Sequence, residues 1–180
     1  VAIFRSGITN TLMNYYETSV VECGDESIPE VDFKIGLRFE KFITPNSPLN
    51  VGPLPVGAYN PVIDGVEAVN DGVVSRGSWL LDSGAAISLI SVGQGVKLGL
   101  TDEDGEAIVA TAFTANIGGV GGIVELAGFE IDELRIDVEE GFDLVFKNAR
   151  VAVHDIAVLD EYTGDFRILE GVFGSNFHIA

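Results

Sequence analysis

Hydrophobic and polar positions alternate in several short stretches of this chain, and this alternation predicts β-strands. From residue 31 to residue 40 every second residue is apolar, and a charged residue or glycine follows each one. A period of two places all the apolar side chains on one face, so we predict a half-buried strand from Val31 to Phe39. The preceding stretch, Val1 to Glu30, has no clear period, and we expect irregular structure with a short strand there.

A proline-rich stretch follows this first strand. Five of the six prolines lie between Pro45 and Pro61, and each proline fixes φ and removes a backbone hydrogen-bond donor. We therefore predict a long linker or surface loop from Thr44 to Gly72. This loop divides the chain into an N-terminal appendage, residues 1–72, and a compact unit, residues 73–180.

The compact unit is predicted to be all-β. One short helical turn is expected between Val92 and Leu100, weakened by three glycines. Asp104-Gly105 suits the turn of a hairpin. Period-two or β-branched patterns predict strands over Val73–Leu81, Ala86–Ile90, Ala107–Ile117, Ile123–Val138 (one or two strands) and Leu144–Leu159 (further strands).

A single acidic residue, Asp82, interrupts the most hydrophobic part of this unit, where residues 79–91 read WLLDSGAAISLIS. Burying an acid between two apolar strands is costly unless a neighbour hydrogen-bonds or protonates it. The hydroxyl of Ser83 and the close-approaching backbone of Gly84 can both hold a carboxylate in a tight turn. We therefore treat Asp82, Ser83 and Gly84 as a candidate catalytic loop, with an ordinary buried turn as the alternative.

A glycine cluster follows further along the chain, where residues 116–124 read NIGGVGGIV. Between two predicted strands, such a cluster makes a hairpin tip with bare backbone N–H and C=O groups. This tip can close over an extended peptide and hydrogen-bond its main chain, although a loose turn is also compatible with the pattern. A phosphate-binding loop fits poorly, because no helix and no Gly-Lys-Ser/Thr follows. The candidate substrate-binding residues are Ile117, Gly118, Gly119, Val120, Gly121 and Gly122.

Composition excludes several other classes of function. The net charge of −18 opposes binding to nucleic acid or to anionic membrane surfaces. Cys23 is the only cysteine, so the chain can form neither an internal disulfide nor a cysteine metal cluster. No apolar run has the length of a membrane-spanning helix.

The remaining side chains suggest no competing chemistry. His154 and His178 lie far apart, and neither a Gly-x-Ser-x-Gly elbow nor a His-x-x-x-His zinc pair is present. Arg135, Arg150 and Arg167 are scattered along the chain and predict no anion-binding cluster. We expect no metal and no cofactor.

Three segments carry a resemblance to one family. The residues Asp82-Ser83-Gly84, followed by Ala85, resemble the Asp-Ser/Thr-Gly loop of aspartic proteases in its retropepsin form. The tip Ile117–Gly122 resembles the flap of retroviral proteases and likewise lies downstream of the acid loop. Residues 170–177, EGVFGSNF, are similar to the family's second signature, an apolar-apolar-Gly segment that threads beside the acid loop. The strand and proline-rich stretch before Asp82 are similar to those of bacterial two-lobed retropepsin-like proteins.

The resemblance implies a fold, an activity and roles for individual residues. The unit from residue 73 onward would be one lobe of a retropepsin- or pepsin-like acid protease barrel, and the activity would be aspartic endopeptidase cleavage of a peptide or protein substrate. Asp82 would supply one carboxylate of a catalytic dyad, Ser83 and Gly84 would orient it, and Gly118 to Gly122 would clamp the substrate. The alternative is a catalytically inactive protease-like β-domain that acts as a binding or structural module.

A dyad needs a second carboxylate, and the sequence holds no second Asp-Ser/Thr-Gly. The partner would come from a second copy of the chain about a twofold axis, or from an upstream lobe. Because 81 residues precede Asp82, more than a retroviral protomer has before its acid loop, we favour the missing N-terminal lobe. Any signal peptide would also lie upstream of Val1, and we expect an extracytoplasmic or secreted protein.

Overall fold

The computed structural model describes residues 2–3, 33–43, 58–119, 122–160 and 163–177. These residues form strands almost throughout, with one short α-helix, α2 (Val92–Lys97), and one 3-10 helix, η1 (Ser175–Phe177). The strands are β1 (Ala2–Ile3), β2 (Lys34–Ile35), β3 (Arg38–Ile43), β4 (Ala58–Asn70), β5 (Val73–Leu81), β6 (Ser88–Ile90), β7 (Phe113–Gly119), β8 (Gly122–Asp137), β9 (Asp143–Val153), β10 (Ala157–Asp160), β11 (Phe166–Ile168) and β12 (Gly171–Phe173). The predicted all-β class is confirmed.

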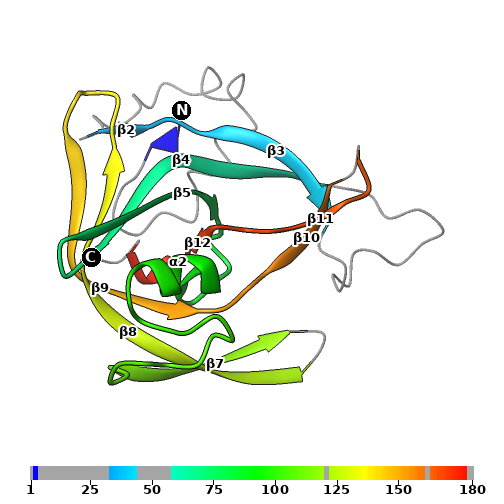
Figure 1. Cartoon of the computed structure of the whole chain (residues 1–180). Coiled ribbons are helices and arrows are strands. Elements are labelled where there is room, and N and C mark those ends of the chain that lie inside the picture. Colours follow the sequence, from blue (N-terminus) through cyan, green and yellow to red (C-terminus); the bar gives the residue numbers. More distant parts are fainter. Residues whose placement is uncertain (1, 4–32, 44–57, 120–121, 161–162, 178–180) are drawn as a thin grey trace, which may run out of the picture.

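Most of the strands belong to one ten-stranded sheet, in the order β11-β10-β3-β4-β5-β12-β6-β9-β8-β7. An additional pairing between β4 and β8 closes β4, β5, β12, β6, β9 and β8 into a ring (Figure 1). The strands β1 and β2 form a separate two-stranded sheet. The ring leaves β7 and β11 as the two edges of the large sheet.

The period-two pattern predicted several strands well. The predicted strand Val73–Leu81 coincides with β5, and the predicted helical turn coincides with α2. The strand expected from Val31 divides into β2 and β3 around Gly36-Leu37 and continues to Ile43, while Val31 and Asp32 lie outside the described residues. The strand expected from Ala107 begins only at Phe113.

The predicted linker is wrong over residues 58–70, which form the long strand β4. Its C-terminal half pairs with both β5 and β8, and its N-terminal half pairs with β3. Pro61 is tolerated because it faces Phe39 of β3, whereas the pairing with β5 begins only at Val62. A proline without a backbone donor can occupy a strand where one side needs no hydrogen bond.

A polar network holds β3, β4 and β5 together next to a bulge in β4. Arg38 donates two hydrogen bonds to the carboxylate of Asp64, at 3.0 and 3.1 Å, and Ser78 Oγ donates another at 2.7 Å. The hydrogen bonds from Arg38 and then Ser78 hold the pKa of Asp64 below its usual value. The Asp64 carboxylate therefore stays negatively charged at neutral and mildly acidic pH.

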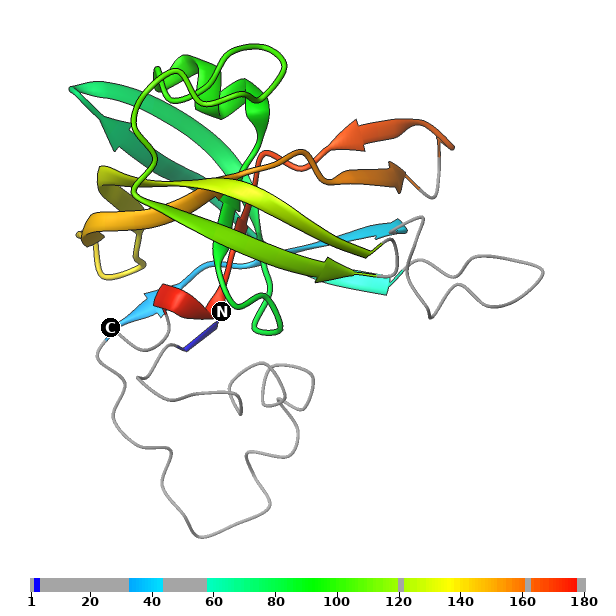
Figure 2. The same cartoon turned by 90° about the horizontal axis from the view of Figure 1, so that it is seen from below.

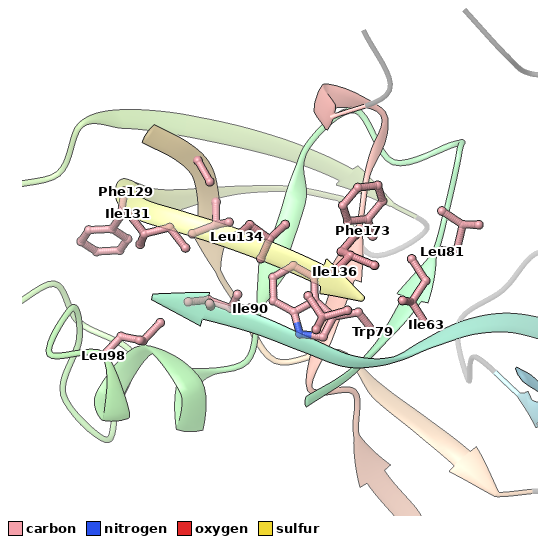
Figure 3. Close-up of a cluster of buried hydrophobic side chains, with 14 of the residues drawn as sticks. Ile63, Trp79, Leu81, Ile90, Leu98, Phe129, Ile131, Leu134, Ile136 and Phe173 are labelled. Atoms are coloured by element: carbon pink, nitrogen blue, oxygen red, sulfur yellow. The ribbon is translucent and has the colours of Figure 1, made fainter. Parts of the chain in front are cut away.

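Two hydrophobic clusters form the core. The larger one lies inside the ring and includes Trp79, Phe129, Leu134 and Phe173, all at most 2% exposed (Figure 3). The smaller cluster contains Phe42, Leu89, Leu126, Ala152, Val158, Leu169 and Val172. Because β6 and β12 supply residues to both clusters, these two central strands are held from both faces.

Candidate active site

The strand β5 delivers Asp82 to the centre of the sheet. Its buried positions alternate, with Ser75, Gly77, Trp79 and Leu81 facing inward. Asp82 follows the last of them directly and is half-buried. The alternation predicted from the sequence therefore ends at the acid itself, where the chain leaves the strand and turns.

A tight turn holds the carboxylate of Asp82. The amide of Gly84 donates to Asp82 Oδ1 at 2.8 Å, and the amide of Ala85 donates to the Asp82 carbonyl at 3.2 Å. A side chain that accepts from the amide two residues on makes an Asx-turn. A Cβ at position 84 would lie 3.2 Å from Asp82 Oδ1, so glycine permits this close approach. Ser83 occupies the same turn and is half-buried.

The strand β12 lies directly beside this turn, between β5 and β6. It runs parallel to β5, with Phe173 opposite Leu81, and antiparallel to β6. The amide of Asp82 donates to the Phe173 carbonyl at 3.0 Å. At the next residue, a Cβ on Gly174 would lie 2.6 Å from the backbone carbonyl carbon of Ile87. The apolar-apolar-Gly segment thus threads beside the acid loop, as the resemblance implies.

Residues beyond Gly174 hold the far end of the acid loop. The amide and the hydroxyl of Ser175 donate to the Ala85 carbonyl, at 2.8 and 2.9 Å. Phe177, at the end of η1, packs its ring against the rings of Phe146 and Phe173, with centroids 4.9 and 5.3 Å away. Figure 2 shows η1 beside the loop that follows β5. The acid loop is therefore held at both ends by the segment from 171 to 177.

The predicted glycine hairpin forms from β7 and β8. Its register pairs Ile117 with Val124 and Gly119 with Gly122, so the tip falls at Val120 and Gly121, which lie outside the described residues. Gly118 also belongs to β7. The hairpin projects from one side of the molecule, in the same direction as the hairpin of β10 and β11 (Figure 1).

The base of this hairpin and the acid loop share a hydrophobic cluster. Ala115 and Ile117 of β7 pack against the smaller core cluster, and so do Ala85 and Ile87 of the acid loop. The strand β7 and the acid loop are therefore packed on one hydrophobic cluster. The structure brings the predicted loop and the predicted hairpin to the same part of the molecule.

Sequence reasoning missed an open groove of about 700 Å³ next to the acid loop. Its lining includes Ala86 and Ile87 after Asp82, Phe113 and Thr114 at the base of the hairpin, and Lys147 and Arg150 on β9. Of the three arginines judged to be scattered, Arg150 lines this groove, and Lys147 joins it there. No pattern within β9 alone indicated that grouping.

Other candidate groups lie elsewhere. His154 is exposed, and no cluster of three or more His, Cys, Asp or Glu residues that could hold a metal occurs within the described ranges. Among those residues, no second carboxylate is hydrogen-bonded to Asp82. No described helix has the length and apolar character needed to cross a membrane.

Comparison with known proteins gives a distant structural likeness. No family model and no curated protein matches the chain. Among solved structures, the chain is similar to a retropepsin-like aspartic protease from Rickettsia conorii, with 17% sequence identity and a TM-score of 0.36. The match covers 81% of this chain and 83% of that one. The chemistry therefore has to be derived from the residues of the site.

Proposed function

We propose that this chain is an aspartic endopeptidase in which Asp82 supplies one carboxylate of a catalytic dyad. The observation that carries the proposal is the turn at Asp82, where backbone groups hold a half-buried carboxylate between three strands. A second support is the glycine hairpin, whose base packs on the same cluster as the acid loop.

The chemistry follows from two carboxyl groups that share one proton. Like charges at close range cannot both ionise, so the pair titrates as a coupled unit with one ionised and one protonated member. The ionised carboxylate takes a proton from a water molecule, which attacks the carbonyl carbon of the peptide bond. The protonated carboxyl donates its proton to the carbonyl oxygen. The tetrahedral intermediate then breaks down to a carboxylic acid and an amine.

The remaining residues have positioning roles in this proposal. The Gly84 amide orients Asp82 through its hydrogen bond to Oδ1, and Ser83 borders the carboxylate within the turn. The glycines from Gly118 to Gly122 present backbone groups to the main chain of an extended substrate. The second carboxylate comes from another copy of the chain or from an upstream lobe.

Replacing Asp82 by asparagine tests the assignment. An amide cannot act as a base, but its oxygen can still accept the hydrogen bond from Gly84, so the fold should survive. We expect Asp82→Asn to lower the rate of peptide cleavage by about a hundredfold or more, while the thermal unfolding midpoint stays close to that of the wild type. The assay is digestion of a mixed peptide substrate at mildly acidic pH, with and without pepstatin.

A matched control is Asp104→Asn, which removes a carboxylate from an exposed turn far along the chain. This variant should cleave like the wild type. Undiminished cleavage by Asp82→Asn would contradict the catalytic role. A folded wild-type chain that binds peptides but cuts none, even when a separate polypeptide with its own Asp-Ser/Thr-Gly loop is added, would instead support the inactive binding module.

A further inference from the structure

We propose that the groove beside the acid loop is a substrate subsite that binds an aspartate or glutamate side chain of the peptide. This inference rests on the proposed peptidase function, because it names the class of substrate that the same site would take. The groove is lined by Ala86 and Ile87 of the loop that follows Asp82 and by Phe113 and Thr114 at the base of the β7–β8 hairpin. A side chain in the groove therefore belongs to a residue a few positions from the cleaved bond.

Arg150 differs from the other described arginines in its ion pairing. The other described arginines, Arg38, Arg76, Arg135 and Arg167, each form an ion pair with a carboxylate. Arg150 forms none with any residue that the structure describes. Its guanidinium carbon lies 5.1 Å from the centre of the Phe113 ring instead, although Glu130 is its direct partner in the strand register.

Lys147 is the second cation of the groove, and its natural partner is already occupied. The register places Glu133 of β8 opposite Lys147. However, Arg135 binds the Glu133 carboxylate through two nitrogens, at 2.6 and 2.7 Å. Within the described parts of the chain, the Lys147 ammonium group makes no ion pair. Two cations thus face one groove in a chain of net charge −18.

A local backbone feature places both cations on one face. In a regular strand, residues 147 and 150 would point to opposite faces because their separation is odd. Asn148 has a φ of 51°, and the inward positions of β9 change there from Leu144 and Phe146 to Ala149 and Val151. Asparagine tolerates this left-handed conformation better than most residues. The change in alternation leaves Lys147 and Arg150 exposed together at the groove.

Hydrogen bonds fix this cationic wall relative to the acid loop. Asn176 Nδ2 donates to the Arg150 carbonyl at 3.0 Å, and Ser88 Oγ donates to Asn176 Oδ1 at 2.8 Å. Ser88 in turn accepts from the amide of Gly174 at 2.8 Å. Asn176 therefore links β9 to β6, Ser88 links β6 to the residue after β12, and the distance from Asp82 to the groove is set by the core of the sheet.

The chemistry of the groove suits a carboxylate on an aliphatic stem. A guanidinium matches a carboxylate with two parallel hydrogen bonds, and an ammonium group adds a second charge. Ile87, Phe113 and Val145 provide apolar walls for the methylene groups of glutamate or aspartate. The net charge of −18 repels acidic peptides from the molecule as a whole, whereas Lys147 and Arg150 attract an acidic side chain in this groove.

A cleavage profile tests the subsite. The wild-type chain, alone and together with a polypeptide that supplies the second carboxylate, is incubated with a proteome-derived peptide library, and the residues around each cut bond are read by mass spectrometry. We expect Asp and Glu to be enriched about fivefold at one position near the cut bond. The double variant Arg150→Gln with Lys147→Gln should remove this enrichment while cutting continues, and Arg150→Glu should favour Lys and Arg there. Lys97→Gln, which removes an exposed cation on α2, should change nothing.

A binding measurement separates this inference from the proposed function. Labelled ten-residue peptides that carry either Glu or Gln at each position are titrated into the Asp82→Asn chain and followed by fluorescence anisotropy. Tighter binding of one Glu peptide that disappears in the Arg150→Gln, Lys147→Gln background supports the subsite even if the wild type never cuts. Cleavage without any acidic preference, or equal binding of the Glu and Gln peptides, overturns the subsite and leaves the proposed function intact.

Discussion

At position 174 the fold has room only for a hydrogen atom. A Cβ there would lie 2.6 Å from the backbone carbon and oxygen of Ile87 and 2.9 Å from the amide of Ser88. These neighbours are backbone atoms of the loop after Asp82, so they cannot move aside as a flexible side chain would. Gly174 therefore determines how closely the segment after β12 approaches the acid loop.

We expect Gly174→Ala to destabilise the chain by about 1–3 kcal/mol, the usual cost of overpacking, and to lower any cleavage activity as well. Urea denaturation measures the first effect and peptide digestion the second. Gly36→Ala is the matched control, since Gly36 is exposed and a Cβ there meets no atom within 4 Å. Equal stability of the two variants would contradict the close packing at Gly174.

At the scale of single residues, the sequence indicated Asp82 as a candidate site but gave no indication of the groove that holds Lys147 and Arg150. Asp82 was identifiable because a charge between two apolar runs is costly and must have a local reason. Arg150 and Lys147 gave no such signal, because exposed cations on a strand are common. The lack of a partner for Lys147 depends on Arg135 binding Glu133, which involves a neighbouring strand. Only the strand register and the conformation of Asn148 bring Lys147 and Arg150 together.

At the scale of elements, the β7–β8 hairpin is the part whose glycines suit contact with a substrate. Valine has a branched side chain that keeps a peptide backbone away from the strand. We expect the pair Gly119→Val and Gly121→Val to lower kcat/KM for peptides by about tenfold or more, with a much smaller change in folding stability. Steady-state kinetics and thermal melting measure the two effects.

The matched control for this pair is Asn116→Val, which places the same side chain at an exposed position on the same hairpin. It should leave kcat/KM close to the wild-type value. If the glycine variants lose stability and activity in equal measure, the hairpin tip has a structural role and does not clamp substrate.

Element prediction succeeded where local signals matched the tertiary structure. The helix α2 has a local N-cap, Ser91, whose hydroxyl accepts from the Gln94 amide at 3.3 Å. The prediction for β4 failed because prolines and glycines normally mark loops. Its strand conformation comes from partners on both sides, β3 or β8 on one and β5 on the other. Those partners are distant in sequence, so a local pattern could not reveal them.

At the scale of the whole molecule, the source of the second carboxylate decides how the proposed enzyme is assembled. Each chain carries a net charge of −18, so two copies repel each other unless their contact is extensive. We expect the 180-residue chain to sediment as a monomer with weak or no cleavage activity. Sedimentation equilibrium and a digestion assay over a range of chain concentrations measure both properties.

Mixing wild-type and Asp82→Asn chains tests whether two copies of the chain form the dyad. If two copies form the dyad, activity per chain rises with concentration, and an excess of Asp82→Asn chains suppresses the wild type by forming mixed dimers. A stable, active dimer of this chain would contradict the upstream-lobe proposal. Activity restored by adding a separate polypeptide that carries its own Asp-Ser/Thr-Gly loop would support it.

The position of β12 also determines when the acid loop can assemble during protein synthesis. Its neighbours β5 and β6 are complete by residue 90, but β12 ends at residue 173. At about 5–20 residues per second, a ribosome needs roughly 4 to 16 seconds for the intervening stretch. During that time β5 and β6 lack the strand between them, and the Asp82 amide lacks its acceptor on Phe173. Until β12 has been made, a nascent chain therefore carries open strand edges at β5 and β6, and its acid loop is unassembled.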